Sequence, residues 1–375
     1  MHRKIVCIGN GPVMSYTPYM AKLANVLNER GLEVLFITWS REDDITTAVD
    51  PSNVEVKVLM RIGKKTDSKL KISFLYIFWM FKLFLYFIKC RESHFICSRF
   101  ESCFPLFVVS AFKKIRYVYA DRDPLHATYK WPFLIKNIIK KVEMMIAKRS
   151  VVHLIPGESR RYTNYENVFV IPNMPTSWAI EKAYLIYKNR NSPFCKEKLI
   201  VYINGWLVET RGKKHILNAL NDSSISDFCH FIVAGDLDLD LRDVVELNSN
   251  VTYLGRLSNE EALSYYFDTD IVVSLYDPSF EINRKAEPNK WWDCVSTGTV
   301  FVTNYGIETV GFFKEYIGFY LIDYFNNRSL SEFLYSVRGN VSGMKRKGNS
   351  IINLDVSWDS NFNIVLDKLY GNKGF

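Results

Sequence analysis

The sequence lacks the cysteine and histidine patterns that organise metal-binding and disulfide-rich proteins. Its seven cysteines are odd in number, no two of them form a CxxC pair, and the six histidines do not cluster. Structural zinc sites and disulfide frameworks need paired ligands or paired thiols. We therefore expect reduced thiols, no metal site and a cytoplasmic location.

Apolar runs long enough to cross a membrane are also missing. The N-terminal run Ile5–Ile8 stops at Gly9, which is typical of a strand and not of a signal peptide. The longest run, Ile72–Ile88, has 17 residues and contains Lys82, whereas a spanning helix needs about 20 apolar residues. Three interpretations stay open: a helix lying in the lipid interface, a helix buried in the protein, or a short span. Basic residues flank the run at Lys64, Lys65, Lys69, Lys71, Lys89 and Arg91.

A strong excess of one charge is absent too. The net charge of +8 is too small to indicate nucleic-acid binding by itself. The charge is uneven, however, because residues 1–175 carry 27 basic and 15 acidic side chains, whereas residues 176–375 carry 21 and 25. This basic half is compatible with a membrane surface, with a phosphorylated substrate, or with scattered solubilising lysines.

What the sequence does contain is an alternation of strand and helix signals. Short apolar runs predict strands, and apolar residues three or four positions apart predict helices. In the first half the predicted strands are 5–10, 33–38, 54–60, 95–97, 116–119, 151–155 and 168–171, and the predicted helices are 19–30, 72–88 and 135–148. Strands separated by helices indicate a mostly parallel sheet.

The alternation pauses near Pro172–Pro175 and then starts again. Mixed polar residues from there to Lys198 predict a linker. Further strands are predicted at 199–204, 228–234, 251–254, 271–275 and 300–303, and helices at 213–220, 260–267, 291–296 and 358–369. We therefore expect an α/β protein of two Rossmann-like domains with a cleft between them.

A glycine pair, Gly9 and Gly11, follows the first predicted strand. A dinucleotide fingerprint would need a third glycine where Met14 stands, and an acidic residue at the end of the second strand, where Thr38 and Trp39 stand. No nicotinamide or flavin cofactor is therefore expected. The pair suits either backbone contact with an anion or a sugar hydroxyl, or a tight turn without a ligand.

Residues 275–293 form the part of the chain that is densest in polar and charged side chains. They follow a predicted strand, so they lie at the carboxyl edge of a parallel sheet, where such folds bind ligands. Pro288 is suited to open a helix, which places Asn289, Lys290 and Asp293 in its first turns. Free amides and a lysine there suit a diphosphate, and the carboxylate suits ribose hydroxyls.

This segment resembles the nucleotide-sugar site of GT-B glycosyltransferases of family 4, a retaining group with an acidic–seven–acidic motif. Asp293 matches the second acidic residue, which holds the nucleotide ribose in that family, but Lys285 replaces the first. Asn283 and Arg284 match an Asn-Arg pair of one branch of the family. Glu308 lies in the loop after the next strand, where the family has a Gly-x-x-Glu turn.

Other segments, in the same order along the chain, are also similar to this family. Residues 204–212 resemble its diphosphate-binding loop, with Arg211 at the position of a lysine and Trp206 at the position of an arginine. Residues 170–175, 231–235 and 251–257 and the last helix, with Trp358, are similar as well. The resemblance thus spans almost the full length.

The resemblance implies a GT-B fold with an acceptor-binding domain (1–175), a nucleotide-sugar-binding domain (176–355) and a C-terminal helix (356–375) that packs back on the first domain. It implies transfer of a hexose-type unit from a nucleotide-diphosphate donor to a saccharide acceptor. The basic first half and the run Ile72–Ile88 suggest that this acceptor is a lipid-linked saccharide, as in cell-surface polysaccharide (O-antigen or capsule) assembly. No metal is expected, because fixed cations would stabilise the leaving diphosphate and the Asp238–Asp240 triplet is interpreted as a solvated loop. No cofactor is expected, since the nucleotide sugar is the substrate. The catalytic residues would be Arg211 and Lys290, and the donor-binding residues Gly205, Asn283, Arg284, Asn289, Asp293 and Glu308.

In the first domain, polar residues that follow predicted strands are candidates for acceptor binding. A salt-bridged turn explains the Asp121–Asp123 part of this set equally well. The candidates are Gly11, Arg99, Glu101, Asp121 and Asp123.

Two other functions stay open. The replacements Lys285 and Trp206 favour a non-catalytic nucleotide-sugar or carbohydrate-binding protein. An isomerase such as a nucleotide-sugar 2-epimerase, or a phosphorylase, is a third hypothesis on the same architecture. We expect no nucleic-acid partner, and a peripheral position on the inner face of the membrane is compatible with the basic first half.

Overall fold

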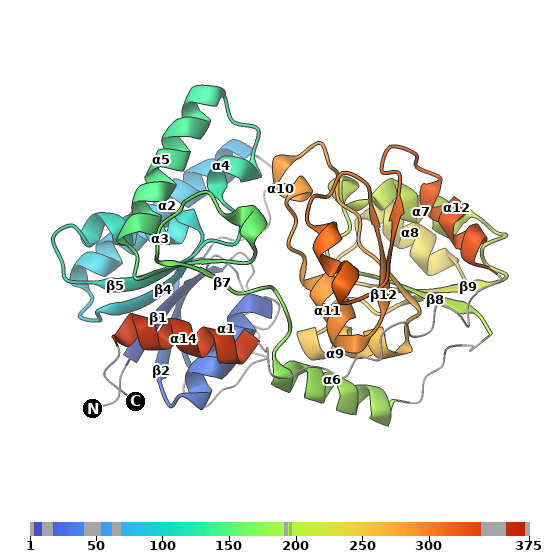
Figure 1. The fold of residues 1–375 in the computed structure, drawn as a ribbon, viewed down its shortest axis with the longest axis horizontal. Coiled ribbons are helices and arrows are strands. Elements are labelled where there is room, and N and C mark those ends of the chain that lie inside the picture. Colours follow the sequence, from blue (N-terminus) through green and yellow to red (C-terminus); the bar gives the residue numbers. More distant parts are fainter. Residues whose placement is uncertain are drawn as a thin grey trace. The chain divides into compact units, whose positions relative to one another are not determined.

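The structure is a computed structural model that describes residues 4–9, 18–40, 54–61, 69–190, 194, 197–338 and 358–371. The chain divides into two compact units, Met1–Pro172 with Trp358–Phe375, and Asn173–Ser357. Each unit is built around its own parallel sheet (Figure 1). The predicted α/β class is therefore confirmed.

The first unit contains a seven-stranded sheet in the order β3-β2-β1-β4-β5-β6-β7. All neighbouring strands are parallel. The order reverses between β1 and β4, and parallel sheets open a crevice at the carboxyl ends of such a pair. The strands are β1 (Lys4–Gly9), β2 (Glu33–Ser40), β3 (Val54–Arg61), β4 (His94–Ser98), β5 (Arg116–Ala120), β6 (Val152–Ile155) and β7 (Val168–Val170).

Three helices, α2 (Lys69–Lys89), α3 (Phe100–Val109) and α5 (Phe133–Arg149), pack on the same apolar cluster of this sheet as Val6 and Ile8. Helix α1 (Pro18–Glu29) contacts α14 (Trp358–Tyr370) instead (Figure 1). The short elements α4 (Leu125–Thr128) and η2 (Glu158–Arg160) lie in loops. None of the described helices has both the length and the apolarity that crossing a bilayer requires.

The closing helix α14 belongs to the first unit although it is the last element of the chain. Trp358 stacks on Phe362 with ring centroids 4.7 Å apart and meets the edge of Tyr19 at 6.0 Å. Arg116 Nε donates a hydrogen bond of 2.7 Å to the carbonyl oxygen of Leu369. The prediction of a C-terminal helix that packs back on the first domain is confirmed.

The second unit repeats the plan with six parallel strands in the order β10-β9-β8-β11-β12-β13. The strand order reverses between β8 and β11, so the crevice of this sheet is expected at their carboxyl ends. The strands are β8 (Leu199–Asn204), β9 (Cys229–Ala234), β10 (Val251–Tyr253), β11 (Ile271–Val273), β12 (Val300–Asn304) and β13 (Phe319–Ile322).

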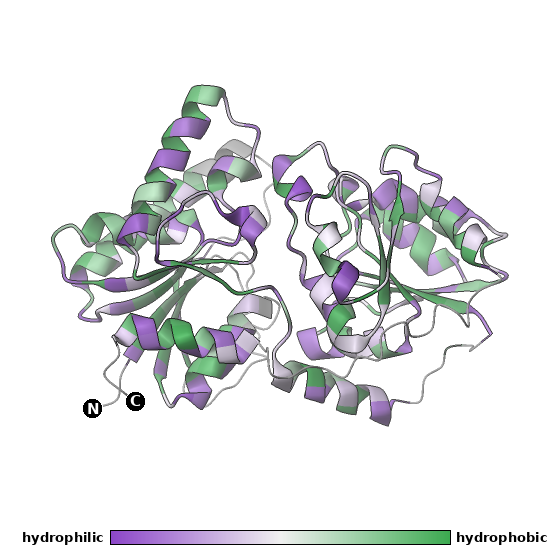
Figure 2. Ribbon diagram, viewed as in Figure 1, coloured by the Kyte–Doolittle hydropathy of each residue, from purple (hydrophilic) through white to green (hydrophobic). Residues whose placement is uncertain are grey.

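Two apolar clusters hold the helices on this sheet. Figure 2 shows that the strands of the sheet are mostly hydrophobic. One contains side chains of α7 (Lys213–Asn221), α8 (Leu239–Leu247) and α12 (Ser329–Val337). The other contains side chains of α6 (Ser177–Asn189), α9 (Asn259–Ser264), α11 (Asn289–Thr297), η4 (Tyr265–Asp268) and η5 (Val310–Glu315). The short elements η3 (Glu209–Arg211) and α10 (Glu281–Arg284) lie in loops after β8 and β11.

The predicted linker between the domains was wrong over 177–189, where the chain forms α6. The Thr176 hydroxyl accepts a hydrogen bond from the Ala179 amide and so caps the first turn. Ala179, Ile180 and Ala183 are buried on one side of the helix. Small alanines at these positions give a weak apolar pattern, which is why the periodicity was not visible in the sequence.

The Asp238–Asp240 triplet is exposed to solvent, as expected, but the expected loop is wrong, because the triplet starts helix α8. Asp238 is the N-cap of α8, and its side chain accepts a hydrogen bond from the Leu241 amide. The ammonium of Lys213 contacts both carboxylates, that of Asp240 at 3.1 Å. The hydrogen bond from Lys213 holds the pKa of Asp238 below its usual range. The triplet therefore starts a helix and pairs with a lysine.

Candidate active site

The predicted donor-binding residues gather on loops that follow β8, β11 and β12 in the second unit. Gly205 and Arg211 follow β8, residues 283–293 follow β11, and Glu308 follows β12. Because the sheet is parallel, these loops all leave its carboxyl edge, on both sides of the β8–β11 reversal. The topology therefore brings the candidates to the position where such folds bind ligands.

At this edge Gly205 lies against the side chain of Lys290. Gly205 has a φ of +94°, and a Cβ added there would lie 3.4 Å from both Cε and Nζ of Lys290. A side chain at position 205 would thus touch the ammonium and, because of the positive φ, strain the backbone. The next residue, Trp206, is 72% exposed. The loop after β8 is therefore a bare backbone turn with a lysine over it and an aromatic ring beside it.

Lys290 gets its position from helix α11. Pro288 is the N-cap, so Lys290 lies in the first turn, and Gly298 ends the helix at a φ of +74°. Trp291, Trp292 and Cys294 are buried on the sheet side, which turns the polar residues of the first turn away from the core. Amide groups of a helix N-terminus and a lysine together favour a bound anion.

Arg211 supplies the second cation. Its guanidinium carbon lies 4.3 Å from the centroid of the Tyr276 ring, a cation–π contact. Its Nη1 atom is buried and has no hydrogen-bond partner within the described chain, and the same holds for Oδ1 of Asn289. Buried polar atoms normally find a partner. These two atoms are therefore sites at which a polar ligand would gain contacts.

Lys290 has an unusual charge environment. Burial of the ammonium and the nearby positive charge of Arg211 lower the pKa of Lys290 to about 8, while Asp293 opposes the shift. No ion pair to Lys290 is found in the parts of the chain that the structure describes. A cation that is half-buried and without a counter-ion raises the affinity of the site for an anion.

Asp293 is held by a chain of hydrogen bonds that sequence reasoning did not find. Asn204 Nδ2 donates to the hydroxyl of Tyr266 at 3.2 Å, and this hydroxyl donates to Oδ2 of Asp293 at 3.4 Å. Burial, together with the charge of Asp293, raises the pKa of Tyr266, so the hydroxyl keeps its proton. Tyr266 belongs to η4, which no local pattern links to α11; only the contact reveals its role.

The loop between β11 and α11 is closed by polar contacts. Arg284 Nε lies 3.7 Å from Oε1 of Glu308, and the Glu308 amide donates to the Arg284 carbonyl at 2.8 Å. Asn283 is buried and donates to the carbonyl of Asp277 at 3.0 Å. Lys285, which replaces the first acidic residue of the motif, pairs with Glu281 at 3.4 Å. The structure thus places Asn283, Arg284 and Glu308 in one loop cluster.

In the first unit, three predicted residues lie at the carboxyl edge of the sheet. Arg99 Nη2 is 3.4 Å from Oδ2 of Asp123, and Arg160, which the sequence analysis did not single out, lies 3.7 Å from Oδ1 of the same carboxylate. Arg99 has a φ of +68°, a strained conformation for a residue with a Cβ. Glu101 lies in the first turn of α3. Backbone strain of this kind often accompanies functional sites.

Asp121 occupies a different environment from its neighbours. It is completely buried, accepts a hydrogen bond of 2.5 Å from the Tyr162 hydroxyl and lies 3.4 Å from Nε2 of His153. Its contacts in this structure are therefore to the protein interior. Gly11, the remaining acceptor-side candidate, lies outside the described residues. Among the described residues, no group of three or more histidine, cysteine or acidic side chains is arranged to hold a metal ion.

No family model matches this chain, and no curated protein sequence matches it. Solved structures do match over nearly the whole length. Sucrose-phosphate synthase from Thermosynechococcus elongatus has 12% sequence identity and a TM-score of 0.69, with 98% of each chain covered. UDP-GlcNAc 2-epimerase from Neisseria meningitidis, solved with UDP-GlcNAc, has 12% identity and a TM-score of 0.61, with 98% of this chain and 99% of that chain covered.

A third similar structure is an Anabaena protein in complex with UDP and glucose. It has 12% identity and a TM-score of 0.59, and the alignment covers 98% of this chain and 95% of that one. At such identities the likeness concerns the fold. The two units with parallel sheets match these structures over nearly the whole chain, so the predicted GT-B fold is confirmed.

Proposed function

We propose that the protein is a glycosyltransferase that uses a nucleotide-diphosphate sugar as its donor. The observation that carries this proposal is the pair of cations, Lys290 and Arg211, at the carboxyl edge of a GT-B sheet. Lys290 has no counter-ion among the described residues, and Arg211 has an unpartnered buried Nη1. A donor diphosphate supplies the negative charge and the acceptor atoms that these groups lack.

The proposed chemistry follows from where charge develops. When the bond between the sugar and the diphosphate breaks, the electron pair stays on the diphosphate oxygen, and the leaving group becomes more negative. Cations that are already fixed in place stabilise this charge more in the transition state than in the bound donor. In this proposal Lys290, Arg211 and the α11 N-terminus perform that task, and Asp293 holds ribose hydroxyls.

The finer assignments are proposals as well. By resemblance we propose a family 4 enzyme that retains the anomeric configuration of a hexose-type sugar and uses no metal. We propose a saccharide or lipid-linked saccharide acceptor, a role in cell-surface polysaccharide (O-antigen or capsule) assembly, and a peripheral position on the inner face of the membrane. The charge of the first half, with 27 basic and 15 acidic residues up to position 175, supports an anionic surface as its partner.

The first test is selective binding of nucleoside diphosphates. Thermal unfolding is measured with UDP, GDP and ADP and with their sugar conjugates, and each diphosphate is compared with its monophosphate. We expect one diphosphate to bind at least tenfold more tightly than its monophosphate, because the second phosphate reaches the two cations. At 100 times its dissociation constant it adds about 2.7 kcal/mol to the free energy of unfolding. Equal affinity for both would contradict the proposed site.

The affinity for the diphosphate is expected to fall as the pH rises through 8. The ligand prefers the protonated form of Lys290, which the free protein loses near pH 8, whereas Arg211 stays charged. Titration calorimetry should show a dissociation constant about tenfold higher at pH 9 than at pH 7. In Lys290→Arg this pH dependence should disappear, because arginine stays protonated. Any pH dependence that remains in this variant comes from titration of the ligand and is subtracted.

A nucleotide-sugar 2-epimerase is the second candidate, since one of the similar structures is such an epimerase with UDP-GlcNAc bound. Incubation with the donor alone separates the two. A transferase releases nucleoside diphosphate slowly by hydrolysis, and faster when an acceptor is present. An epimerase yields the 2-epimer without an acceptor, and a non-catalytic binding protein yields neither product.

A further inference from the structure

One side of helix α2 exposes a stripe of large apolar side chains. Six of them along the 21-residue helix are between 41% and 71% exposed: Phe74, Ile77, Phe78, Phe81, Leu85 and Ile88. The opposite side anchors the helix, because Trp79, Leu83 and Phe87 are fully buried in the core of the first unit. Soluble monomers rarely expose apolar patches of this extent unless the patch binds something.

Exposed apolar side chains also occur on the neighbouring helices. Helices α2 and α3 contact each other, as do α3 and α5, so the three form one layer on the sheet. On α5 the residues Leu134, Ile138 and Met145 are exposed, and Phe112 is exposed just after α3. The apolar surface of the first unit is therefore a property of the helical layer and not of one side chain.

Positive charge accompanies these apolar residues. Helix α2 contains four lysines and no acidic residue. Helix α5 contains five basic residues and one acidic residue, Glu143, which is fully buried and accepts a hydrogen bond from the Leu125 amide. The solvent-facing charge of both helices is thus entirely positive. An apolar, basic and acid-free helix surface is typical of segments that lie on anionic lipid.

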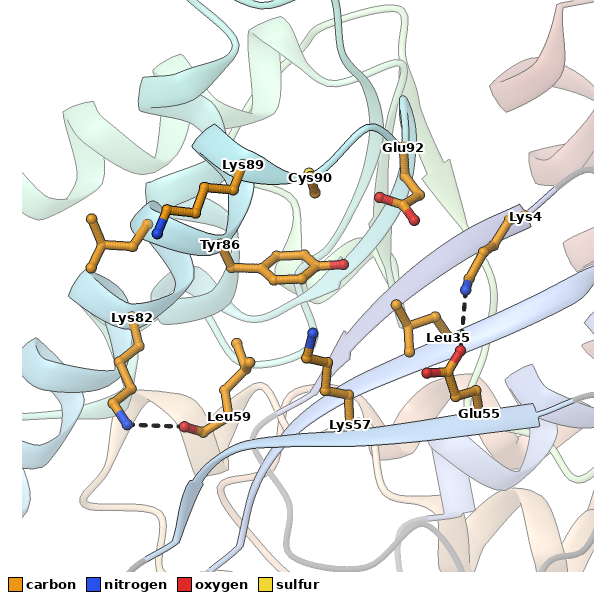
Figure 3. Close-up of a pocket in the computed structure, with 11 residues that line it drawn as sticks. Lys4, Leu35, Glu55, Lys57, Leu59, Lys82, Tyr86, Lys89, Cys90 and Glu92 are labelled. Carbon is orange, nitrogen blue, oxygen red and sulfur yellow. Dashed lines mark hydrogen bonds and ion pairs between the residues drawn. The ribbon is translucent and has the colours of Figure 1, made fainter.

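A groove of about 550 Å³ between α2 and the β1–β3 side of the sheet adds charge at the margin of this surface (Figure 3). Of its four lysines, Lys4 pairs with Glu55 at 3.1 Å and Lys82 donates to the Leu59 carbonyl at 3.0 Å. Lys57 lies over the Tyr86 ring, and Lys89 ends the helix. Lys57 and Lys89 are therefore the cations that face solvent without a carboxylate at ion-pair distance in the described chain.

We propose that the outer side of α2 and α5 is the surface by which the first unit docks on an anionic bilayer. Helix α2 lies in the interface, with its exposed side chains among the acyl chains and with Lys57 and Lys89 against lipid phosphates. A second copy of the chain fits this surface less well, since a symmetric dimer would bring two sets of lysines together. The surface deepens the proposed function by giving a lipid-linked acceptor a place to meet the enzyme.

Vesicle sedimentation tests the surface with the full chain. One set of vesicles contains phosphatidylcholine alone. The other contains phosphatidylcholine with about 30% of the anionic lipid phosphatidylglycerol. We expect binding to the anionic vesicles and at least a tenfold loss of partitioning in Phe74→Ser/Ile77→Ser/Phe81→Ser. Lys57→Glu/Lys89→Glu should lose at least about 25-fold, because each lysine near the surface contributes about fivefold.

Matched controls carry the same changes in the second unit. Leu185→Ser/Leu239→Ser/Leu247→Ser removes three exposed leucines there, and Lys182→Glu/Lys314→Glu reverses two exposed lysines; both should bind vesicles like the wild type. Binding that survives the α2 triple variant overturns the proposal. A second outcome also overturns it: the wild type is a dimer in sedimentation velocity, the triple variant is a monomer, and the wild type does not bind the vesicles.

The same variants distinguish failure of this surface from failure of the proposed function. Nucleoside diphosphate binding, measured by thermal shift on each variant, reports on the second unit and on folding together. A variant that binds the diphosphate like the wild type is folded, so its loss of vesicle binding is assigned to the surface. Vesicle binding by a protein that binds no nucleotide would support the surface and contradict the proposed transferase.

Discussion

Lys290→Ala is expected to lower kcat/KM for sugar transfer by about 10²- to 10³-fold, the range found when one donor to a developing anion is removed. The ammonium lies over the bare turn at Gly205 and carries no ion pair in the described chain. It is therefore available to the leaving diphosphate, and nothing adjacent substitutes for it except Arg211. Initial rates at low donor concentration measure the effect.

The same variant should not destabilise the ligand-free protein. Lys290 lies in the first turn of α11, where the helix dipole disfavours a cation, and the charge of Arg211 is close enough to lower its pKa. Removing the ammonium relieves both effects, so the free energy of unfolding should stay equal or rise by about 0.3–1 kcal/mol. Loss of activity together with unchanged or higher stability identifies a residue that acts on the ligand and does not stabilise the fold.

Two variants complete this test. Lys314→Ala removes an exposed lysine from the same unit and should change neither rate nor stability. Lys290→Arg keeps the charge and should retain part of the activity. A rate for Lys290→Ala within threefold of the wild type would remove the basis of the proposed mechanism.

Gly235→Ala is expected to cost about 3 kcal/mol or more of folding free energy and to abolish diphosphate binding. A Cβ at this position would lie 2.2 Å from the carbonyl oxygen of Gly205, and the φ of +123° is closed to other residues. The carbonyl belongs to backbone, so no side chain can move aside. The Gly205 turn, on which Lys290 rests, must shift instead. Chemical denaturation and calorimetry with the diphosphate measure the two effects.

Substitutions at two other glycines serve as controls with smaller expected costs. At Gly255 an added Cβ meets nothing within 4 Å, but φ is +65°, so Gly255→Ala should cost about 1–2 kcal/mol through backbone strain alone. At Gly311 there is neither a contact within 4 Å nor a positive φ, so Gly311→Ala should be nearly neutral. A Gly235→Ala protein as stable as Gly311→Ala would show that the β8 and β9 ends do not touch.

Most strands were predictable because parallel strands are buried on both faces. The run 199–204, for example, forms β8 with every residue buried. Helix α11 was predictable because Pro288 and Gly298 mark its ends. The helix α6 was not, since its buried side presents two alanines and one isoleucine, which contrast little with the other residues. Local pattern thus fails where small side chains do the packing.

The candidate site divides in the same way. Asn289, Lys290 and Asp293 were found from one segment, because a helix start after a strand determines where they lie. Tyr266 and Tyr276 were not found, since each contacts a residue far away in the sequence: Tyr266 contacts Asp293, and Tyr276 contacts Arg211. The role of a tyrosine in such a site depends on its neighbour and not on its flanking residues.

By itself the sequence determined the two parallel sheets and the loops that carry charge, because hydrophobic periodicity and glycine positions are local properties. The return of the last helix to the first unit was implied only by the resemblance to a known family. Tertiary structure alone decided which charges meet. It placed Lys290 over Gly205 without a counter-ion among the described residues, buried Asp121 beneath Tyr162, and turned one side of α2 to solvent. The physical reason is that burial and charge pairing depend on contacts between distant segments, which only the packed chain creates.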